Sequence, residues 1–187
     1  MIPEEKKKIL DEFNNTRTDY PQDKAIHALF EEQVERIPDR IAVLGRGPTR
    51  TNTDNNVPIY VTYKELNKIS DCLAGLLIEI GVLADDIVGI LMDPSPEMIV
   101  GILGILKAGA AYLPIDPAYP DERIDYMLKD SAAKIIVGNR HACSAGLNCQ
   151  WLIVNCELLM SVPDAPFHHS SFIIHHSSHL AYIMYTS

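Results

Sequence analysis

The residues whose types most clearly suggest chemistry are Thr186 and Ser187, the last two of the printed sequence. They follow a short apolar run, Leu180 to Tyr185, that predicts a β-strand. A strand that leads into hydroxyl side chains and open backbone N–H groups is a common beginning of a phosphate-binding loop, because both kinds of donor can face an anion. The glycines that turn such a loop are not within the 187 residues. Alone, the pair predicts a frayed chain end; in a longer protein, it predicts the start of a phosphate site.

Histidine is the second residue type that could do chemistry here. Two His-His pairs stand seven residues apart in a Ser-rich stretch, without the i, i+4 helical spacing or the carboxylate or thiol partners of a metal site. We therefore predict a solvated loop from Ser161 to His179 and no metal site. The histidines considered are His141, His168, His169, His175, His176 and His179.

Composition limits the class of protein. A length of 187 residues with 47% hydrophobic residues fits one globular domain, or most of one, and the net charge of −9 argues against a nucleic-acid binder. The longest apolar run, Met98 to Leu106, is too short to cross a bilayer, and the charged N-terminus has no signal-like core. We expect a cytoplasmic protein. The cysteines form no C-x-x-C pair, so free thiols are expected at Cys72, Cys143, Cys149 and Cys156.

Secondary-structure patterns must position these residues. Apolar periodicity and capping signals predict four helices, at Ala25 to Ile37, after Thr62, from Ser95 to Ala108 and from Pro120 to Lys129. Short apolar runs predict strands at Arg40 to Leu44, Ile87 to Met92, Ala111 to Ile115, Lys134 to Val137, Trp151 to Val154 and Leu180 to Tyr185. Strands and helices alternate in the second half, so the fold class is α/β, a mostly parallel sheet with helices on its faces.

Several local signals refine this arrangement. Thr62 and Glu65 have the spacing of a capping box, and Ser95 is expected to cap the third helix. Gly101 and Gly104 lie one turn apart and would let that helix approach a sheet closely. Gly45 to Pro58 is rich in turn-forming residues and is predicted to be a surface loop joining two strands of a hairpin-like pair. The first helix is expected to turn Ile26, Leu29, Phe30 and Val34 to one face.

Several segments carry a resemblance to a known family. Leu106 to Asp116, Leu-Lys-Ala-Gly-Ala-Ala-Tyr-Leu-Pro-Ile-Asp, resembles a core motif of the adenylation domains of nonribosomal peptide synthetases, and Pro117 to Ile124 continues it. Val61 to Leu66 is similar to the preceding core motif, and Leu180 to Ser187 to the beginning of the next. Pro38 to Ala42 resembles the start of the domain, and Phe13 to Pro21 the connector from a condensation domain.

The resemblance implies a division of the chain and a chemistry. Residues 1–25 would be a linker of the condensation-to-adenylation type, and residues 26–187 a truncated N-terminal subdomain of an AMP-binding adenylation domain. In this family an amino acid is activated as aminoacyl-AMP with ATP and Mg²⁺, and is then loaded on the phosphopantetheine thiol of a carrier domain. Implied partners are the amino acid, carrier and condensation domains, and an MbtH-like protein as an optional one.

The resemblance places few of the family's site residues in this chain. Thr186 and Ser187 match the start of the loop that holds the ATP phosphates, and no catalytic residue of the family falls within the 187 residues. We take Lys107 and Asp116 as structural, and we expect the chain alone to be inactive. Two alternatives stay open: a non-catalytic remnant that keeps contacts with neighbouring domains, and a piece of an acyl-CoA or aryl-acid ligase.

Overall fold

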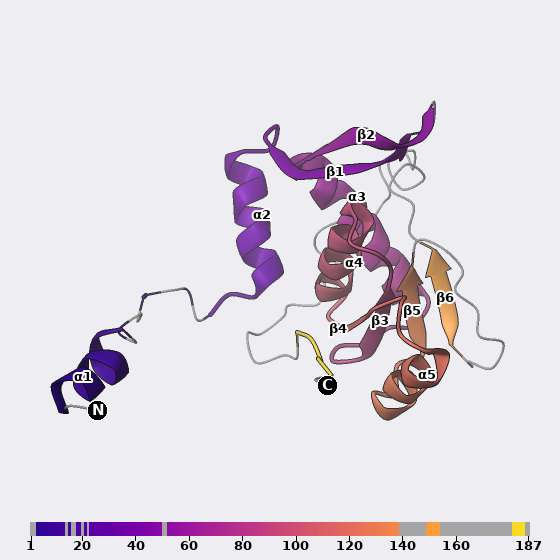
Figure 1. Cartoon of the computed structure of the whole chain (residues 1–187). Helices are drawn as coiled ribbons and strands as arrows, with labels where there is room; N and C mark the ends of the chain where they lie inside the picture. The colour runs from indigo at the N-terminus through magenta and orange to yellow at the C-terminus, as the bar shows by residue number, and fades with distance from the viewer. Residues whose placement is uncertain are drawn as a thin grey trace.

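The computed structural model describes residues 3–13, 15, 18–19, 21, 23–49, 52–138, 149–153 and 181–185. Within these ranges helices and strands alternate from β3 to β5, as the predicted α/β class requires (Figure 1). The elements are α1 Pro3–Lys7, a π-helical turn η1 Lys8–Glu12, α2 Ile26–Arg36, β1 Ile41–Thr49, β2 Asn52–Thr62, α3 Tyr63–Glu79, β3 Ile87–Leu91, α4 Pro96–Lys107, β4 Ala111–Ile115, α5 Asp121–Asp130, β5 Ile135–Gly138 and β6 Gln150–Ile153.

Four strands form a parallel sheet in the order β4-β3-β5-β6. Helix α4 connects β3 to its neighbour β4, and α5 then leads back past β3 to β5. Helices α3 and α4 pack with Ile90 and Val137 on one face, whereas α5 packs with Leu113 and Ile136 on the other. The predicted parallel sheet with helices on its faces is confirmed.

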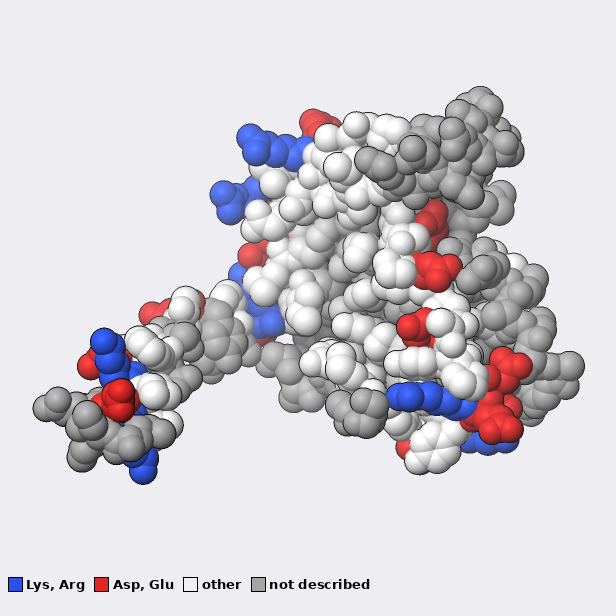
Figure 2. Space-filling model, in the orientation of Figure 1, with Lys and Arg blue, Asp and Glu red and all other residues white. Residues whose placement is uncertain are grey.

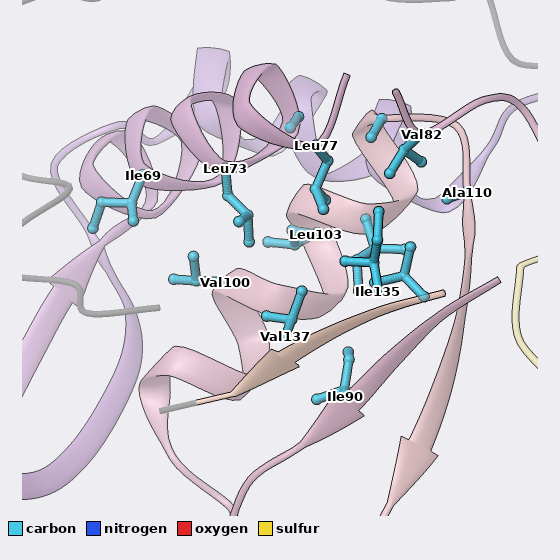
Figure 3. Close-up of a cluster of buried hydrophobic side chains, with 14 of the residues drawn as sticks. Ile69, Leu73, Leu77, Val82, Ile90, Val100, Leu103, Ala110, Ile135 and Val137 are labelled. Carbon is cyan, nitrogen blue, oxygen red and sulfur yellow. The ribbon is translucent and has the colours of Figure 1, made fainter. Parts of the chain in front are cut away.

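The larger core cluster lies between α3, α4 and the sheet (Figure 3). In Figure 3 the side chains of Ile69, Leu73 and Leu77 on α3 point toward α4. A Cβ atom added at Gly104 would lie 2.7 Å from Cδ2 of Leu73, whereas one at Gly101 would have no neighbour closer than 3.6 Å. The expectation that both glycines serve a close approach to the sheet is therefore wrong for Gly104, which faces α3.

The capping prediction for α3 is confirmed, and the one for α4 is confirmed in position but not in its side-chain bond. Thr62 Oγ1 accepts from the Glu65 N–H at 3.2 Å, and Glu65 Oε2 accepts from the Thr62 N–H at 2.9 Å. Ser95 stands at the N-cap of α4, but its hydroxyl forms no capping bond. The Met98 N–H bonds instead to the Ser95 carbonyl oxygen at 3.1 Å, so the hydroxyl oxygen stays buried without a partner among the described residues.

The predicted hairpin is present, but the loop predicted from Gly45 to Pro58 is not. Strands β1 and β2 pair antiparallel, with Gly47 opposite Val57 and Thr49 opposite Asn52. Strand pairing is made by backbone N–H and carbonyl groups, so it does not require the apolar alternation that identifies most strands in a sequence. The turn-rich composition therefore hid two long strands.

Two features stand out in the N-terminal part. Residues 3–12, within the predicted linker, form α1 and η1, which lie apart from the rest of the chain in Figure 1. Helix α2 forms where predicted, but none of its residues is buried and Ile26 is 60% exposed. Its apolar face is therefore only partly covered, chiefly at Phe30, which packs against the main core cluster.

Candidate functional site

The candidate phosphate-binding residues Thr186 and Ser187 lie outside the described residues. The segment that leads to them, residues 181–185, lies beside the edge strand β4. The Tyr112 N–H donates to the Ala181 carbonyl oxygen at 3.0 Å, and the Ile183 N–H donates to the Tyr112 carbonyl oxygen at 3.1 Å. These bonds make a single parallel bridge between Tyr112 and Tyr182, so the predicted strand is confirmed only as one bridge.

A side-chain contact ties the end of this segment to α5. The Tyr185 hydroxyl donates to Asp130 Oδ2 at 2.6 Å, and the Tyr185 ring meets the Tyr126 ring edge-on at 6.3 Å between centroids. This hydrogen bond to a carboxylate is the largest cause that raises the pKa of Tyr185 to about 12. Burial, and then the neighbouring Tyr182, raise the pKa of Tyr112. Both phenols are therefore neutral hydrogen-bonding groups near neutral pH.

Asp116, at the end of the long motif from Leu106 to Asp116, makes a structural contact, as predicted. Asp116 Oδ1 accepts from the Ala118 N–H at 2.8 Å and closes the turn between β4 and α5. The carboxylate is therefore already used by its own turn.

Lys107 has a larger role than a cation in the last turn of a helix. Its side chain is only 1% exposed, and Nζ donates to Asp71 Oδ1 at 2.5 Å and to Asn67 Oδ1 at 2.7 Å on α3. Nζ also lies 3.8 Å from Glu31 Oε1 and 5.6 Å from the ring centroid of Phe30, both on α2. A buried ammonium with these partners connects three helices, and it is a structural group rather than a reactive one.

The thiols and the predicted absence of a metal site need only a short account. Cys72 is buried and Cys149 is half-buried, both are free, and burial is the largest cause that raises the pKa of each. Within the described ranges, no group of three or more His, Cys, Asp and Glu side chains could hold a metal ion. No helix of the described part is long and apolar enough to span a bilayer. The loop from Ser161 to His179 and the histidines named above fall outside those ranges.

The sequence was then compared with known proteins. Residues 30–187 match the family described as AMP-binding enzyme. The chain belongs to this family. Aligned over its whole length, it is 43% identical to gramicidin S synthase 2 of Aneurinibacillus migulanus and 40% identical to tyrocidine synthase 3 of Brevibacillus parabrevis. The chain spans 4% and 3% of the lengths of these two relatives. The predicted resemblance to the adenylation domains of peptide synthetases is confirmed.

Comparison with solved structures gives the same result for the fold. The nonribosomal peptide synthetase FmoA3, in its alpha-methyl-L-serine-AMP bound form, superposes with a TM-score of 0.75 at 28% identity, over 94% of this chain and 18% of that one. The N-terminal subdomain of Klebsiella oxytoca NpsA, in complex with 3-hydroxybenzoyl-AMSN, gives a TM-score of 0.70 at 24% identity, over 88% of this chain and 38% of that one. At that lower identity the likeness shows the fold alone.

The sequence analysis did not predict the contact of Lys107 with Asp71 or that of Tyr185 with Asp130. Lys107 and Asp71 are 36 residues apart, and Tyr185 and Asp130 are 55 apart, so no local spacing relates either pair. The only signal for Lys107 was its place in a continuous apolar run, where a charged residue needs a partner if it is buried. No pattern around Asp130 distinguished it from the other acidic residues of α5.

Proposed function

We propose that this chain is the N-terminal part of an adenylation domain that activates an amino acid for nonribosomal peptide synthesis. The observation that carries the proposal is the alignment of all 187 residues of the chain with gramicidin S synthase 2, at 43% identity. The family match over residues 30–187 and the fold shared with a peptide synthetase bound to an aminoacyl-AMP support it. The alternative of an aryl-acid or acyl-CoA ligase has weaker support. NpsA, whose structure contains the aryl compound 3-hydroxybenzoyl-AMSN, resembles the chain at only 24% identity.

In the proposed reaction a carboxylate oxygen of the amino acid attacks the α-phosphorus of ATP. The bond from that phosphorus to the β-phosphate oxygen breaks, and pyrophosphate leaves with the electron pair. The aminoacyl group then passes to the phosphopantetheine thiol of a carrier domain, and AMP leaves. Catalysis of this kind depends on positioning the reactants and on neutralising phosphate charge.

The part of this chemistry assigned to the chain is limited. We assign Thr186 and Ser187 to the loop that binds the ATP phosphates, since hydroxyl and backbone N–H donors suit phosphate oxygens. Mg²⁺ would neutralise phosphate charge during the reaction, but no residue of this chain is assigned to hold it. The catalytic acids and lysine expected for the family match no position in the 187 residues, so the chain by itself is proposed to be inactive.

The division of the chain follows the same proposal. Residues 1–25 are a linker that joins a condensation domain to the adenylation domain, and residues 26–187 belong to the adenylation domain. The partners are the amino acid substrate, the carrier and condensation domains, and optionally an MbtH-like protein. The cytoplasm is the proposed compartment.

Amino-acid-dependent exchange of labelled pyrophosphate into ATP tests the proposal. The whole native protein that contains this chain should exchange in the presence of one amino acid or a few related ones, and the purified 187-residue chain should not. In the whole protein, Ser187→Ala should raise the KM for ATP, and Tyr182→Phe, a hydroxyl loss five residues earlier, should leave it unchanged. Absence of exchange with every amino acid would favour a non-catalytic remnant, and exchange with aryl acids would favour the ligase alternative.

A further inference from the structure

The buried ammonium of Lys107 holds two sets of contacts that differ in exposure. Asp71 is 15% exposed and Asn67 also donates to it, through Nδ2 at 3.0 Å, so this set is internal to the pair α3 and α4. Glu31 on α2 is 37% exposed and lies 3.8 Å from Nζ. Asp71 and Asn67 therefore compensate the buried positive charge of Lys107. Glu31 adds an acidic contact between Lys107 and the partly exposed helix α2.

Helix α2 is packed on α3 and α4 without burying any of its side chains. None of its residues is buried, and its best apolar contact is Phe30, whose ring stacks on Tyr63 at 5.9 Å between centroids. The chain just after α2 is fixed to the start of α3 by two backbone bonds, from the Lys64 N–H to the Pro38 carbonyl oxygen and from the Tyr63 N–H to the Arg40 carbonyl oxygen, both at 2.9 Å. The helix is therefore anchored beyond its C-terminal end and touches Lys107 at Phe30 and Glu31.

Helix α2 is thus held at two places: by the backbone bonds just after its C-terminal end, and by its contacts with Lys107. We propose that Lys107 locks the orientation of α2 on the α3–α4 pair, through Glu31 and the ring of Phe30, and that loss of this contact lets α2 swing about residues 37–40. A buried ion pair commonly adds little net stability, because desolvation offsets the Coulomb attraction, but it can select one arrangement over others. The predicted effect of the Lys107–Glu31 contact is thus on where α2 lies rather than on how stable the sheet is.

The lock has a consequence for neighbouring parts of the protein. Helix α2 stands to one side of α3 and α4 in Figure 1, and the segment before it leaves from its far end. If residues 1–25 are the linker of the proposed function, on which this step alone rests, the angle of α2 sets the direction in which the linker leaves the domain. Lys107 would then define the relative placement of two domains without touching the substrate.

Hydrogen exchange read by mass spectrometry tests the lock on the 187-residue chain, at sub-micromolar concentration and without ATP. Two adjacent glutamates give a matched pair of variants: Glu31 faces Lys107, whereas Glu32 pairs with Lys24 at the surface. Glu31→Gln should speed exchange of the α2 amides about three- to fivefold, the scale of a partly exposed ion pair, and leave α3 and α4 unchanged. Glu32→Gln should change α2 by less than about twofold.

Two further measurements keep the proposal testable if a variant folds poorly. High salt should speed α2 exchange in the wild-type chain and much less in Glu31→Gln, because the Lys107–Glu31 contact is already absent there. Lys107→Met should speed α2 exchange more than Glu31→Gln does, and it should also loosen α3 and α4, because Asp71 loses its cation. Equal behaviour of the two glutamate variants, or loosening of α2 in Glu31→Gln only together with α3 and α4, would overturn the proposal. Neither result bears on adenylation, which is tested separately by pyrophosphate exchange.

Discussion

Three helices of this protein end in the same way, and a single residue differs among them. In α3, α4 and α5 the chain closes each helix with a left-handed residue, at Gly81, Gly109 and Ala132, with φ of 93°, 90° and 56°. In each case the next N–H bonds back to a carbonyl five residues earlier, as from Ala133 to Leu128 at 3.1 Å. Glycine adopts this conformation without steric cost, whereas Ala132 places a Cβ against its own backbone.

We therefore expect Ala132→Gly to stabilise the protein, although glycine also makes the unfolded chain more flexible. Removing the left-handed strain should raise the free energy of unfolding by about 0.5–1 kcal/mol. The matched control is Gly81→Ala, which builds a Cβ with no atom within 4 Å and so changes the backbone alone. That control should destabilise by a similar amount. Urea denaturation measures both, and equal midpoints for the three proteins would contradict the assignment.

Tyr185 gives the protein a component of stability that depends on alkaline pH. Its pKa is about 12 in the folded chain, raised mainly by the hydrogen bond to Asp130, against 10.0 for an ordinary tyrosine. Folding thus favours the neutral phenol, so this contribution is complete below pH 10 and is lost as the pH rises through 12. The difference in unfolding free energy between wild type and Tyr185→Phe should be constant up to pH 10 and then shrink. A difference that is flat across the whole range would contradict it.

Local polar contacts could be predicted from the sequence, and distant ones could not. The Thr62–Glu65 capping box was predicted because its two residues lie only three positions apart in the chain. The contacts of Lys107 and Tyr185 depend on how elements pack, so their partners cannot be found by spacing. The candidate phosphate-binding residues came from a resemblance, and their placement lies outside the described part of the chain.

At the scale of elements, Gly104 determines how closely α4 packs on α3. Gly104→Ala would place its Cβ 2.9 Å or less from Cβ, Cγ and Cδ2 of Leu73, and the Leu73 Cβ cannot move without its backbone. The two helices would have to separate, and we expect a loss of about 1–3 kcal/mol. Gly101→Ala, one turn earlier, meets only ordinary contacts and should be neutral or stabilise the helix by up to about 1 kcal/mol. Thermal melting of the two variants separates these outcomes, and equal melting temperatures would contradict the packing.

The elements predicted well are those whose burial requires a regular pattern of apolar residues. The buried strands β3, β4 and β5 read as apolar runs, and α4 carries its start and stop signals. The hairpin was predicted too short, because the backbone pairing of β1 and β2 continues through Gly, Asn and Thr residues. The face of α2 was predicted but not its shallow burial, since periodicity shows which side turns inward and not what covers it.

For the molecule as a whole, the cover of the parallel sheet is uneven. On the face drawn in Figure 2 the central surface carries mostly uncharged side chains. At the β4 edge, Tyr182 stacks on Tyr112 at 5.7 Å between centroids, and Pro114 follows two residues later on the same strand. Tyr182 and Met184 are 50% and 64% exposed, whereas Ile183 and Tyr185 between and after them pack against the α5 cluster. Among the described residues, the side of the sheet that α3 and α4 cover elsewhere is thus left exposed at this edge.

An uncovered apolar strip beside an edge strand favours association, because a second chain can bury both the side chains and the unpaired backbone groups. We expect the 187-residue chain to exceed its monomer mass of 20.8 kDa in light scattering, increasingly so at higher concentration. Met184→Lys should return the mass toward the monomer, since burial of a lysine at a chain–chain contact is costly. Leu44→Lys, at an equally exposed position on β1, is the control and should have little effect. A wild-type monomer at every concentration, or equal rescue by both lysines, would contradict the role of this edge.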